Sequence, residues 1–131
     1  MYEILIPIDD ENRGIRQVES VLDMPFDVAD IHVTLLHVFT ENPEGASVSQ
    51  VGAIHDARDL LEEADIEITL AERSGTPAAE IIAEANDRDA DLIVLAGRAR
   101  SPTGKALFGS TTQQVILDTD RPVVVHSVSQ D

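Results

Sequence analysis

The residues best suited to chemistry lie in a window of the sequence that contains no acidic residue. Positions 92–117 hold no Asp or Glu, although the 131-residue chain carries 25 acidic residues. Three of the nine basic residues fall in this window, among glycines and hydroxyl side chains: Gly97, Arg98, Arg100, Gly104, Lys105, Gly109, Ser110 and Thr111. Main-chain N–H groups at glycines, hydroxyl donors, cationic side chains and a helix N-terminus together suit a phosphate. The window therefore predicts an anion site.

The spacing of these residues excludes two familiar phosphate loops and leaves one simpler interpretation open. A Walker A loop is excluded because six residues separate Gly97 from Gly104, and Lys105 is followed by Ala106 instead of the hydroxyl that binds magnesium. The dinucleotide fingerprint is excluded because it follows the first strand and needs tighter glycine spacing. A glycine-bearing turn whose basic residues pair with neighbouring acids remains an alternative to the anion site.

The apolar residues predict the elements that would position this window. Five apolar runs lie at residues 4–8, 31–39, 66–71, 92–96 and 123–125, and the second, fourth and fifth are typical of strands buried on both faces. Between them lie helical stripes, the first formed by Ile15, Val18 and Leu22, and the last helix covers about 110–117. Thr76 and Pro77 are suited to the start of the third helix. We therefore predict an α/β fold, one domain over residues 1–131 with a doubly wound, five-stranded parallel sheet flanked by four helices.

The composition is that of a protein with an apolar core, and it argues against nucleic-acid binding and against functions that need cysteine. Hydrophobic residues make up 43% of the chain, so a core can form despite a formal net charge of −16. Three Phe, one Tyr and no Trp offer few stacking surfaces, and the negative charge would repel phosphate backbones, so we expect no nucleic-acid partner. The absence of cysteine excludes disulfides, a thiolate zinc site and a cysteine nucleophile.

The N-terminus predicts the cellular location of the protein, and the acidic residues predict the salt concentration around it. The opening residues, MYEILIPIDD, have no basic segment and reach acidic residues within ten positions, so we expect neither a signal peptide nor a membrane span, and a cytoplasmic location. The many Asp and Glu residues predict a solvated acidic surface suited to concentrated salt, which screens the self-repulsion of a halophilic protein. The alternative to adaptation to salt is that the acidic residues form a surface that binds a partner.

Six short segments, taken in order along the chain, resemble the universal stress protein family. They lie at residues 4–9 (ILIPID), 35–38 (LLHV), 75–78 (GTPA), 90–97 (ADLIVLAG), 109–111 (GST) and 120–125 (DRPVVV). The resemblance, to a small acidic member of haloarchaeal type, implies an adenine nucleotide alpha hydrolase-like fold with strand order 3-2-1-4-5. In that order a ligand should lie where strands 1 and 4 diverge. The family likeness also implies a homodimer through the last strand, Val123, Val124 and Val125.

The resemblance further implies that the protein binds ATP or another adenine nucleotide. ATP-binding members carry a glycine, a second glycine three residues later, and Gly-Ser or Gly-Thr ten residues after that. Gly97 and Gly109-Ser110 match the first and last parts, whereas Arg100 occupies the second glycine's position and the last glycine comes one residue early. The side chain of Arg100 either blocks close backbone approach or binds phosphate through its guanidinium.

The resemblance also assigns residues to the nucleoside part of the ligand. It implies that Asp9 contacts the adenosine, with Ile8 beside the base and Val38 lining its pocket. The alternative is that Asp9 or Asp10 caps the helix containing Ile15. One carboxylate together with phosphate oxygens could hold Mg²⁺, although two acids alone do not specify a metal site.

Three functions follow from these observations and remain open. The first is a stress-response protein that binds an adenine nucleotide and changes its partner interactions with occupancy. The second is a dimeric interaction module of the same fold that binds no nucleotide. The third, slow nucleotide hydrolysis, requires a general base, for which Asp9 is the only candidate. The four histidines show no ligand spacing, and His37 and His126, in predicted strands, are expected to be structural hydrogen-bonding groups.

Overall fold

The computed structural model describes residues 1–9, 13–40, 45, 47, 51–97 and 108–127. Five strands form one parallel sheet: β1 (Tyr2–Pro7), β2 (Ile31–Phe39), β3 (Glu67–Ser74), β4 (Leu92–Gly97) and β5 (Val123–Ser127). Their order across the sheet is β3-β2-β1-β4-β5, which confirms the predicted order.

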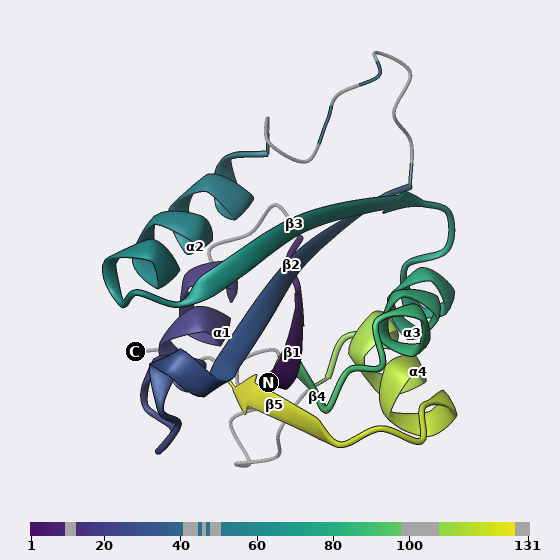
Figure 1. The fold of residues 1–131 in the computed structure, drawn as a ribbon. Coiled ribbons are helices and arrows are strands. Elements are labelled where there is room, and N and C mark those ends of the chain that lie inside the picture. Colours follow the sequence, from purple (N-terminus) through teal and green to yellow (C-terminus); the bar gives the residue numbers. More distant parts are fainter. Residues whose placement is uncertain (10–12, 41–44, 46, 48–50, 98–107, 128–131) are drawn as a thin grey trace, which may run out of the picture.

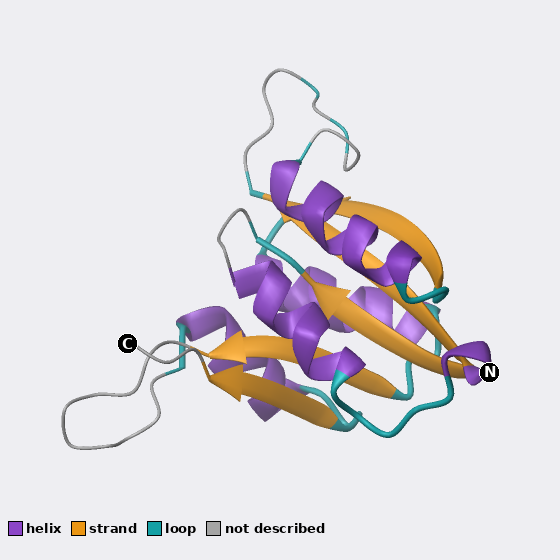
Figure 2. Cartoon of the chain, turned by 90° about the vertical axis from the view of Figure 1, so that its left-hand side faces the viewer, coloured by secondary structure: helices purple, strands orange, loops and turns teal. Residues whose placement is uncertain are grey.

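Four α-helices cover the two faces of this sheet. They are α1 (Arg13–Leu22), α2 (Gly52–Glu63), α3 (Pro77–Asp87) and α4 (Ser110–Asp118), and a short 3-10 helix, η1 (Val28–Asp30), precedes β2. The first two helices lie on one face and the other two on the opposite face (Figure 1), and the view in Figure 2 looks onto the side of α1 and α2. This arrangement confirms the predicted doubly wound architecture. None of these helices is long and apolar enough to cross a membrane.

The core consists of two apolar layers that share the strands between them. Alternate strand residues, such as Ile4, Val33 and Val94, pack under α1 and α2. Their neighbours, such as Leu5 and Ile93, pack under α3 and α4. Both faces of the central strands are therefore buried, which explains why these strands appear in the sequence as nearly unbroken apolar runs.

The start of α1 differs from the sequence-based prediction. Ile15 is only half-buried and Leu22 is 37% exposed, so the predicted stripe was wrong for these two residues. Val18 is buried as predicted, and Gly14, Gln17 and Val21 also face inward. Residues 10–12, which precede α1, lie outside the described residues, so the alternative in which Asp9 or Asp10 caps this helix stays a prediction.

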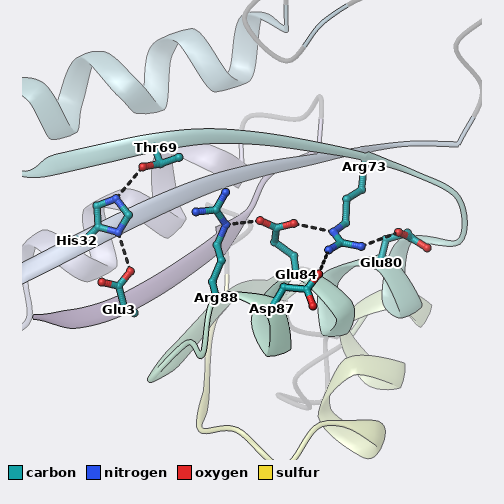
Figure 3. Close-up of polar contacts among 8 residues, drawn as sticks. All are labelled: Glu3, His32, Thr69, Arg73, Glu80, Glu84, Asp87 and Arg88. Atoms are coloured by element: carbon teal, nitrogen blue, oxygen red, sulfur yellow. Dashed lines mark hydrogen bonds and ion pairs between the residues drawn. The ribbon is translucent and has the colours of Figure 1, made fainter.

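One further expectation concerns the polar side chain of Thr76. Thr76 occupies the N-cap position of α3 as predicted, but its side chain makes no capping hydrogen bond within the described part of the chain. At the N-terminal end of the sheet, His32 joins three strands, because its Nδ1 lies 2.7 Å from a Glu3 carboxylate oxygen and its Nε2 lies 2.8 Å from the Thr69 hydroxyl (Figure 3). The role of His32 in the fold is to link these strands.

Candidate functional site

A cleft of about 500 Å³ lies at the carboxyl ends of β1, β2 and β4. It occupies the point where the strand order reverses, which is where open parallel sheets bind ligands. The residues that line it come from the three strand ends, from α1 and from the N-terminal parts of α3 and α4: Pro7, Ile8, Asp9, Gln17, Leu36, His37, Val38, Phe39, Thr40, Pro77, Ile81, Leu95, Ala96, Gly109, Ser110, Thr111 and Thr112.

The cleft brings together predicted site residues from three separate segments of the chain. Six predicted site residues line it, namely Ile8, Asp9, Val38, Gly109, Ser110 and Thr111. Gly97 is the buried last residue of β4 and is not among the lining residues. The other four predicted residues, Arg98, Arg100, Gly104 and Lys105, lie outside the described residues.

The two strands at the base of the cleft separate soon after they pair. β1 pairs with β4 at only two positions, Ile4 with Leu92 and Leu5 with Ile93. Its pairing with β2 on the other side continues as far as Pro7. The sheet therefore splits between β1 and β4 toward its carboxyl edge, and this split forms the base of the cleft.

Gln17 bridges the split from α1. Its side-chain Nε2 donates to the main-chain oxygen of Pro7 at 2.7 Å and to that of Val94 at 3.0 Å. The residue is only 2% exposed, yet it is one of the lining residues. Sequence reasoning missed Gln17. The available signal was a polar residue within the inward-facing positions of an amphipathic helix.

The wall on the β2 side is held by the main chain of Ile8. The Ile8 N–H donates to the oxygen of Leu36 at 2.8 Å, and His37 Nδ1 lies 2.8 Å from the oxygen of Ile8. Because a carbonyl oxygen only accepts, Nδ1 must carry the proton, so in the neutral ring Nε2 is the acceptor. The His37 ring also packs edge-on against Phe39, with ring centroids 4.6 Å apart. His37 is thus a structural hydrogen-bonding group, as predicted, and it also lines the cleft.

A glycine allows α1 to approach this wall. A Cβ atom built on Gly14 would lie 2.9 Å from Cγ2 of Ile8, which is too close for any side chain. The contact is with a branched methyl group near the backbone, which cannot swing away freely. Gly14 therefore fixes how closely the first turn of α1 packs on the site residue Ile8.

The opposite wall is the N-terminus of α4. Gly109 is its N-cap, with an extended backbone, and the first turn carries no acidic residue. The Thr112 hydroxyl donates to the main-chain oxygen of Ala96 at 3.0 Å, which fixes the first turn of the helix over the end of β4. The first N–H groups of a helix lack intrahelical acceptors, so the start of α4 offers donors and partial positive charge to the cleft.

The third wall, at α3, is attached to β3 by ion pairs. Gly75, just before the helix, has φ of +142° and donates its N–H to the oxygen of Phe39 at 3.0 Å. A Cβ on Gly75 would lie 3.1 Å from Oε2 of Glu80. Glu80 in turn lies 3.3 Å from Arg73. These contacts connect the cleft wall to the charged surface of α3.

Arg73 on β3 contacts three carboxylates along α3 (Figure 3). Its Nε lies 2.6 Å from Glu84, and its other nitrogens contact Glu80 and Asp87. Glu84 is buried and also contacts Arg88. Burial alone would raise the pKa of Glu84, but the hydrogen bonds from Arg73 and Arg88 outweigh burial and lower it. The hydrogen bond with Glu84 in turn raises the pKa of Arg73. Both groups are therefore held in their charged forms.

The charges that line the described cleft are few. Asp9 is the single acidic side chain among the lining residues, and the first turn of α4 carries none. The described residues contain no group of three or more His, Cys, Asp or Glu that could hold a metal ion. The arrangement combines an apolar side at Ile8 and Val38 with a donor-rich side at Ser110 and Thr111, and such a site suits a ligand with an apolar ring and an anionic group.

Comparison of this chain with models of known protein families identifies its family. The model of the universal stress protein family matches residues 1–127. The chain belongs to the universal stress protein family. A universal stress protein from Mycolicibacterium smegmatis is 32% identical over 80 residues, which are 60% of this chain and 62% of that relative. The alignment therefore spans less than two thirds of the relative's length.

Solved structures of other family members share the fold. The universal stress protein of Archaeoglobus fulgidus in complex with dAMP superposes with a TM-score of 0.67 at 19% identity, covering 95% of this chain and 97% of that one. A universal stress protein family member from Arabidopsis thaliana with AMP bound superposes with a TM-score of 0.74 at 15% identity, covering 100% and 94%. At these identities the likeness shows the fold of the family.

Proposed function

We propose that this universal stress protein binds ATP or a related adenine nucleotide in the cleft and changes its interactions with partner proteins when the cleft is occupied. One observation carries the proposal: the same cleft is lined by the apolar residues Ile8 and Val38, by Asp9 and by the start of α4. The base of a nucleotide suits an apolar surface, its sugar suits a hydrogen-bond acceptor, and its phosphate suits the start of a helix. The dAMP and AMP bound to the two family members above support the same ligand class.

Each part of the nucleotide has a proposed contact. The base lies beside Ile8 and Val38, and Asp9 accepts a hydrogen bond from a sugar hydroxyl. The phosphates lie at Ser110 and Thr111, whose main-chain N–H groups begin α4. Charge for the phosphates would come from the acid-free window through Arg98, Arg100 and Lys105, with Gly97 and Gly104 allowing close backbone approach.

The cleft offers few protein ligands for Mg²⁺, and we propose no catalytic reaction. Asp9 is the only carboxylate among the lining residues, so Mg²⁺ would take most of its ligands from phosphate oxygens and water. Catalysis is not part of the proposal, because no lining residue pairs a nucleophile with a positioned general base.

The second candidate is an interaction module, and an edge of the sheet favours it. β5 is an outer strand that pairs only with β4 in the described sheet, and its Val123, Val124 and Val125 are half-buried. Nearby on the chain, Leu117 of α4 is 70% exposed. Open apolar sheet edges are usually paired or covered, so we propose a homodimer through β5, with or without nucleotide.

The composition also supports a proposal about the cellular location and the host of the protein. A chain of net charge −16 without cysteine suits a reducing interior of high salt, so we propose that it is a cytoplasmic protein of a halophile.

The nucleotide proposal is tested by adding one negative charge at either of two places on α4. Ser110 is exposed at the first position of the helix, where a carboxylate favours the helix but repels a phosphate. We expect Ser110→Glu to weaken ATP and AMP binding at least about tenfold by calorimetric titration in concentrated salt. The matched variant Gln113→Glu adds the same charge at an exposed residue that does not line the cleft, and we expect less than a twofold change. Equal effects of both variants, or no binding by the wild type, would contradict the proposal.

A further inference from the structure

We propose that the end of the sheet opposite the cleft is a docking surface for a basic, amphipathic segment of a partner protein. The inference adds a partner surface to the proposed function and does not depend on the nucleotide site. Seven large apolar side chains are exposed among the described residues, and four of them, Met1, Tyr2, Leu22 and Val28, lie in segments 1–2 and 22–28. Single exposed apolar residues are ordinary, whereas apolar residues that gather in one place mark interaction sites.

Contacts between these two segments bring apolar side chains together. The Tyr2 ring packs on Phe26, with ring centroids 5.2 Å apart. Tyr2 also pairs with Ile31, and η1 places Val28 in the short connection between Phe26 and Ile31. Figure 2 shows the N-terminus beside this short helix, at the end of the sheet away from the arrowheads of the strands. We call Met1, Tyr2, Phe26 and Val28 the apolar patch.

The apolar patch is anchored to the core and open on its outer side. Phe26 packs against the core under α1 and α2, which fixes the ring that supports Tyr2. Met1 is 68% exposed, Tyr2 37% and Val28 39%. Met and aromatic residues are enriched at protein interfaces, and Tyr loses little conformational entropy when a partner covers it. The patch is therefore preformed for the apolar residues of a partner.

The charges beside the apolar patch favour a basic partner. Three exposed carboxylates, Asp23, Asp27 and Asp30, flank the patch along the chain. None of the three forms an ion pair within the part of the chain that the structure describes, although Asp27 accepts a hydrogen bond from the N–H of Ala29. No Lys or Arg occurs in residues 17–57. On α3, by contrast, arginines neutralise the carboxylates.

The occupant that fits both features carries Lys or Arg beside apolar residues. Its apolar residues cover the patch, and its cations reach the flanking carboxylates, since the long stems of Lys and Arg also cover apolar surface. An acidic partner would place like charges together, which costs affinity. Salt screens exposed charges strongly but partly buried pairs much less, so this complementarity also operates in raised salt.

The probe is a synthetic peptide of Leu and Lys at helical spacing, with one apolar face. The control peptide has Ser in place of every Leu and the same charge. Calorimetric titration is done at the lowest salt concentration at which circular dichroism shows folded protein. We expect the Leu-Lys peptide to bind at least about tenfold more tightly than the Ser-Lys peptide, because it also buries apolar surface. No binding of the Leu-Lys peptide, or equal affinities for both peptides, would overturn the proposal.

Apolar variants of the protein locate the bound peptide. We expect Val28→Ser and Tyr2→Ser to weaken binding of the Leu-Lys peptide about tenfold, because both remove exposed apolar surface from the patch. The matched variant Leu117→Ser removes a side chain from α4 that is still more exposed, and we expect less than about a twofold change. Circular dichroism confirms that each variant is folded. A similar effect of all three variants would overturn the proposed place of docking.

A charge variant and the oligomeric state complete the test. We expect Asp30→Asn to weaken peptide binding about threefold, and Asp56→Asn, at an exposed residue of α2, to leave it unchanged. Equal effects of these two variants would overturn the role of the flanking carboxylates. A wild-type dimer that Val28→Ser converts to a monomer in light scattering would show that a second copy covers the patch, which also overturns the proposal. Val28 does not line the cleft, so neither failure affects the nucleotide proposal.

Discussion

The hydroxyl of Thr112 donates to the main-chain oxygen of Ala96 at 3.0 Å, and this contact joins the first turn of α4 to the end of β4. Thr112 is buried, so the contact is shielded from water. The position of the helix N-terminus at the cleft therefore depends on a side-chain hydrogen bond as well as on apolar packing.

Removing this hydroxyl should destabilise the protein. Thr112→Val keeps the shape of the side chain but leaves the Ala96 oxygen without its donor, so we expect the free energy of unfolding to fall by about 1 to 3 kcal/mol. Urea unfolding followed by circular dichroism measures this change. Thr111→Val, on the neighbouring half-buried residue, should change it by less than about 0.5 kcal/mol. Equal decreases in the free energy of unfolding for the two variants would show that the hydrogen bond from Thr112 to Ala96 does not stabilise the protein.

The buried carboxylate Glu84 should make stability depend on pH. Its pKa is lowered in the folded protein, so its contribution is complete above the ordinary carboxyl pKa and is lost as pH falls through the lowered value. We expect Glu84→Gln to lower the free energy of unfolding at pH 7 by about 1.5 to 3 kcal/mol, because charged hydrogen bonds to Arg73 and Arg88 are lost.

The difference between wild type and Glu84→Gln should then shrink in acid. Urea unfolding at a series of pH values from 7 downward measures it, and comparing two proteins cancels the titration of the other acidic residues. Glu63→Gln, at an exposed position at the end of α2, serves as the control for removing one negative charge. A Glu84→Gln difference that stays constant from neutral pH into the acid range would refute the proposed charge pairing.

The close contact between Gly14 and Ile8 predicts an asymmetry between two glycines. Alanine normally favours a helix over glycine by about 1 kcal/mol, but at Gly14 the added Cβ would lie 2.9 Å from Ile8. Overpacking costs about 1 to 3 kcal/mol, so we expect Gly14→Ala to lower the melting temperature. Gly52→Ala, where nothing lies within 4 Å of the new atom, should leave it unchanged or raise it. Stabilisation by both variants would show that the Ile8 contact relaxes at no cost.

The fold could be predicted from the sequence more completely than the site. Strands such as 31–39 and 92–97 are buried on both faces, so their apolar runs show in the composition itself. Ile8, Asp9 and Val38 were predicted through the family resemblance, and the Gly109 segment was predicted from the window without acidic residues. Gln17 was not predicted: its polar side chain occupies an inward-facing position of α1, but the helix pattern does not identify its two partners, Pro7 and Val94. The pairing of Arg73 with Glu84 also depends on tertiary packing, since the residues belong to different elements.

The dimer proposal predicts a change in mass when β5 is altered. Val124→Lys places a charge on the edge strand, and we expect a monomer in light scattering where the wild type is a dimer. Val124 also packs against the core under α1 and α2, so circular dichroism must show that the variant is folded. The variant His126→Cys, whose cysteine is the only one in the chain, should give a cross-linked dimer on oxidation. A folded Val124→Lys variant that stays dimeric would place the interface elsewhere.

The most direct test of nucleotide binding in the cleft is an amide NMR titration of the labelled protein with AMP in concentrated salt. We expect the largest shift changes at Ile8, Val38, Ser110 and Thr111, which line the cleft. Only small changes should occur around Asn86 and Arg121, which line a separate hollow of about 350 Å³. No change at millimolar AMP, or changes that concentrate at Asn86 and Arg121, would contradict the account.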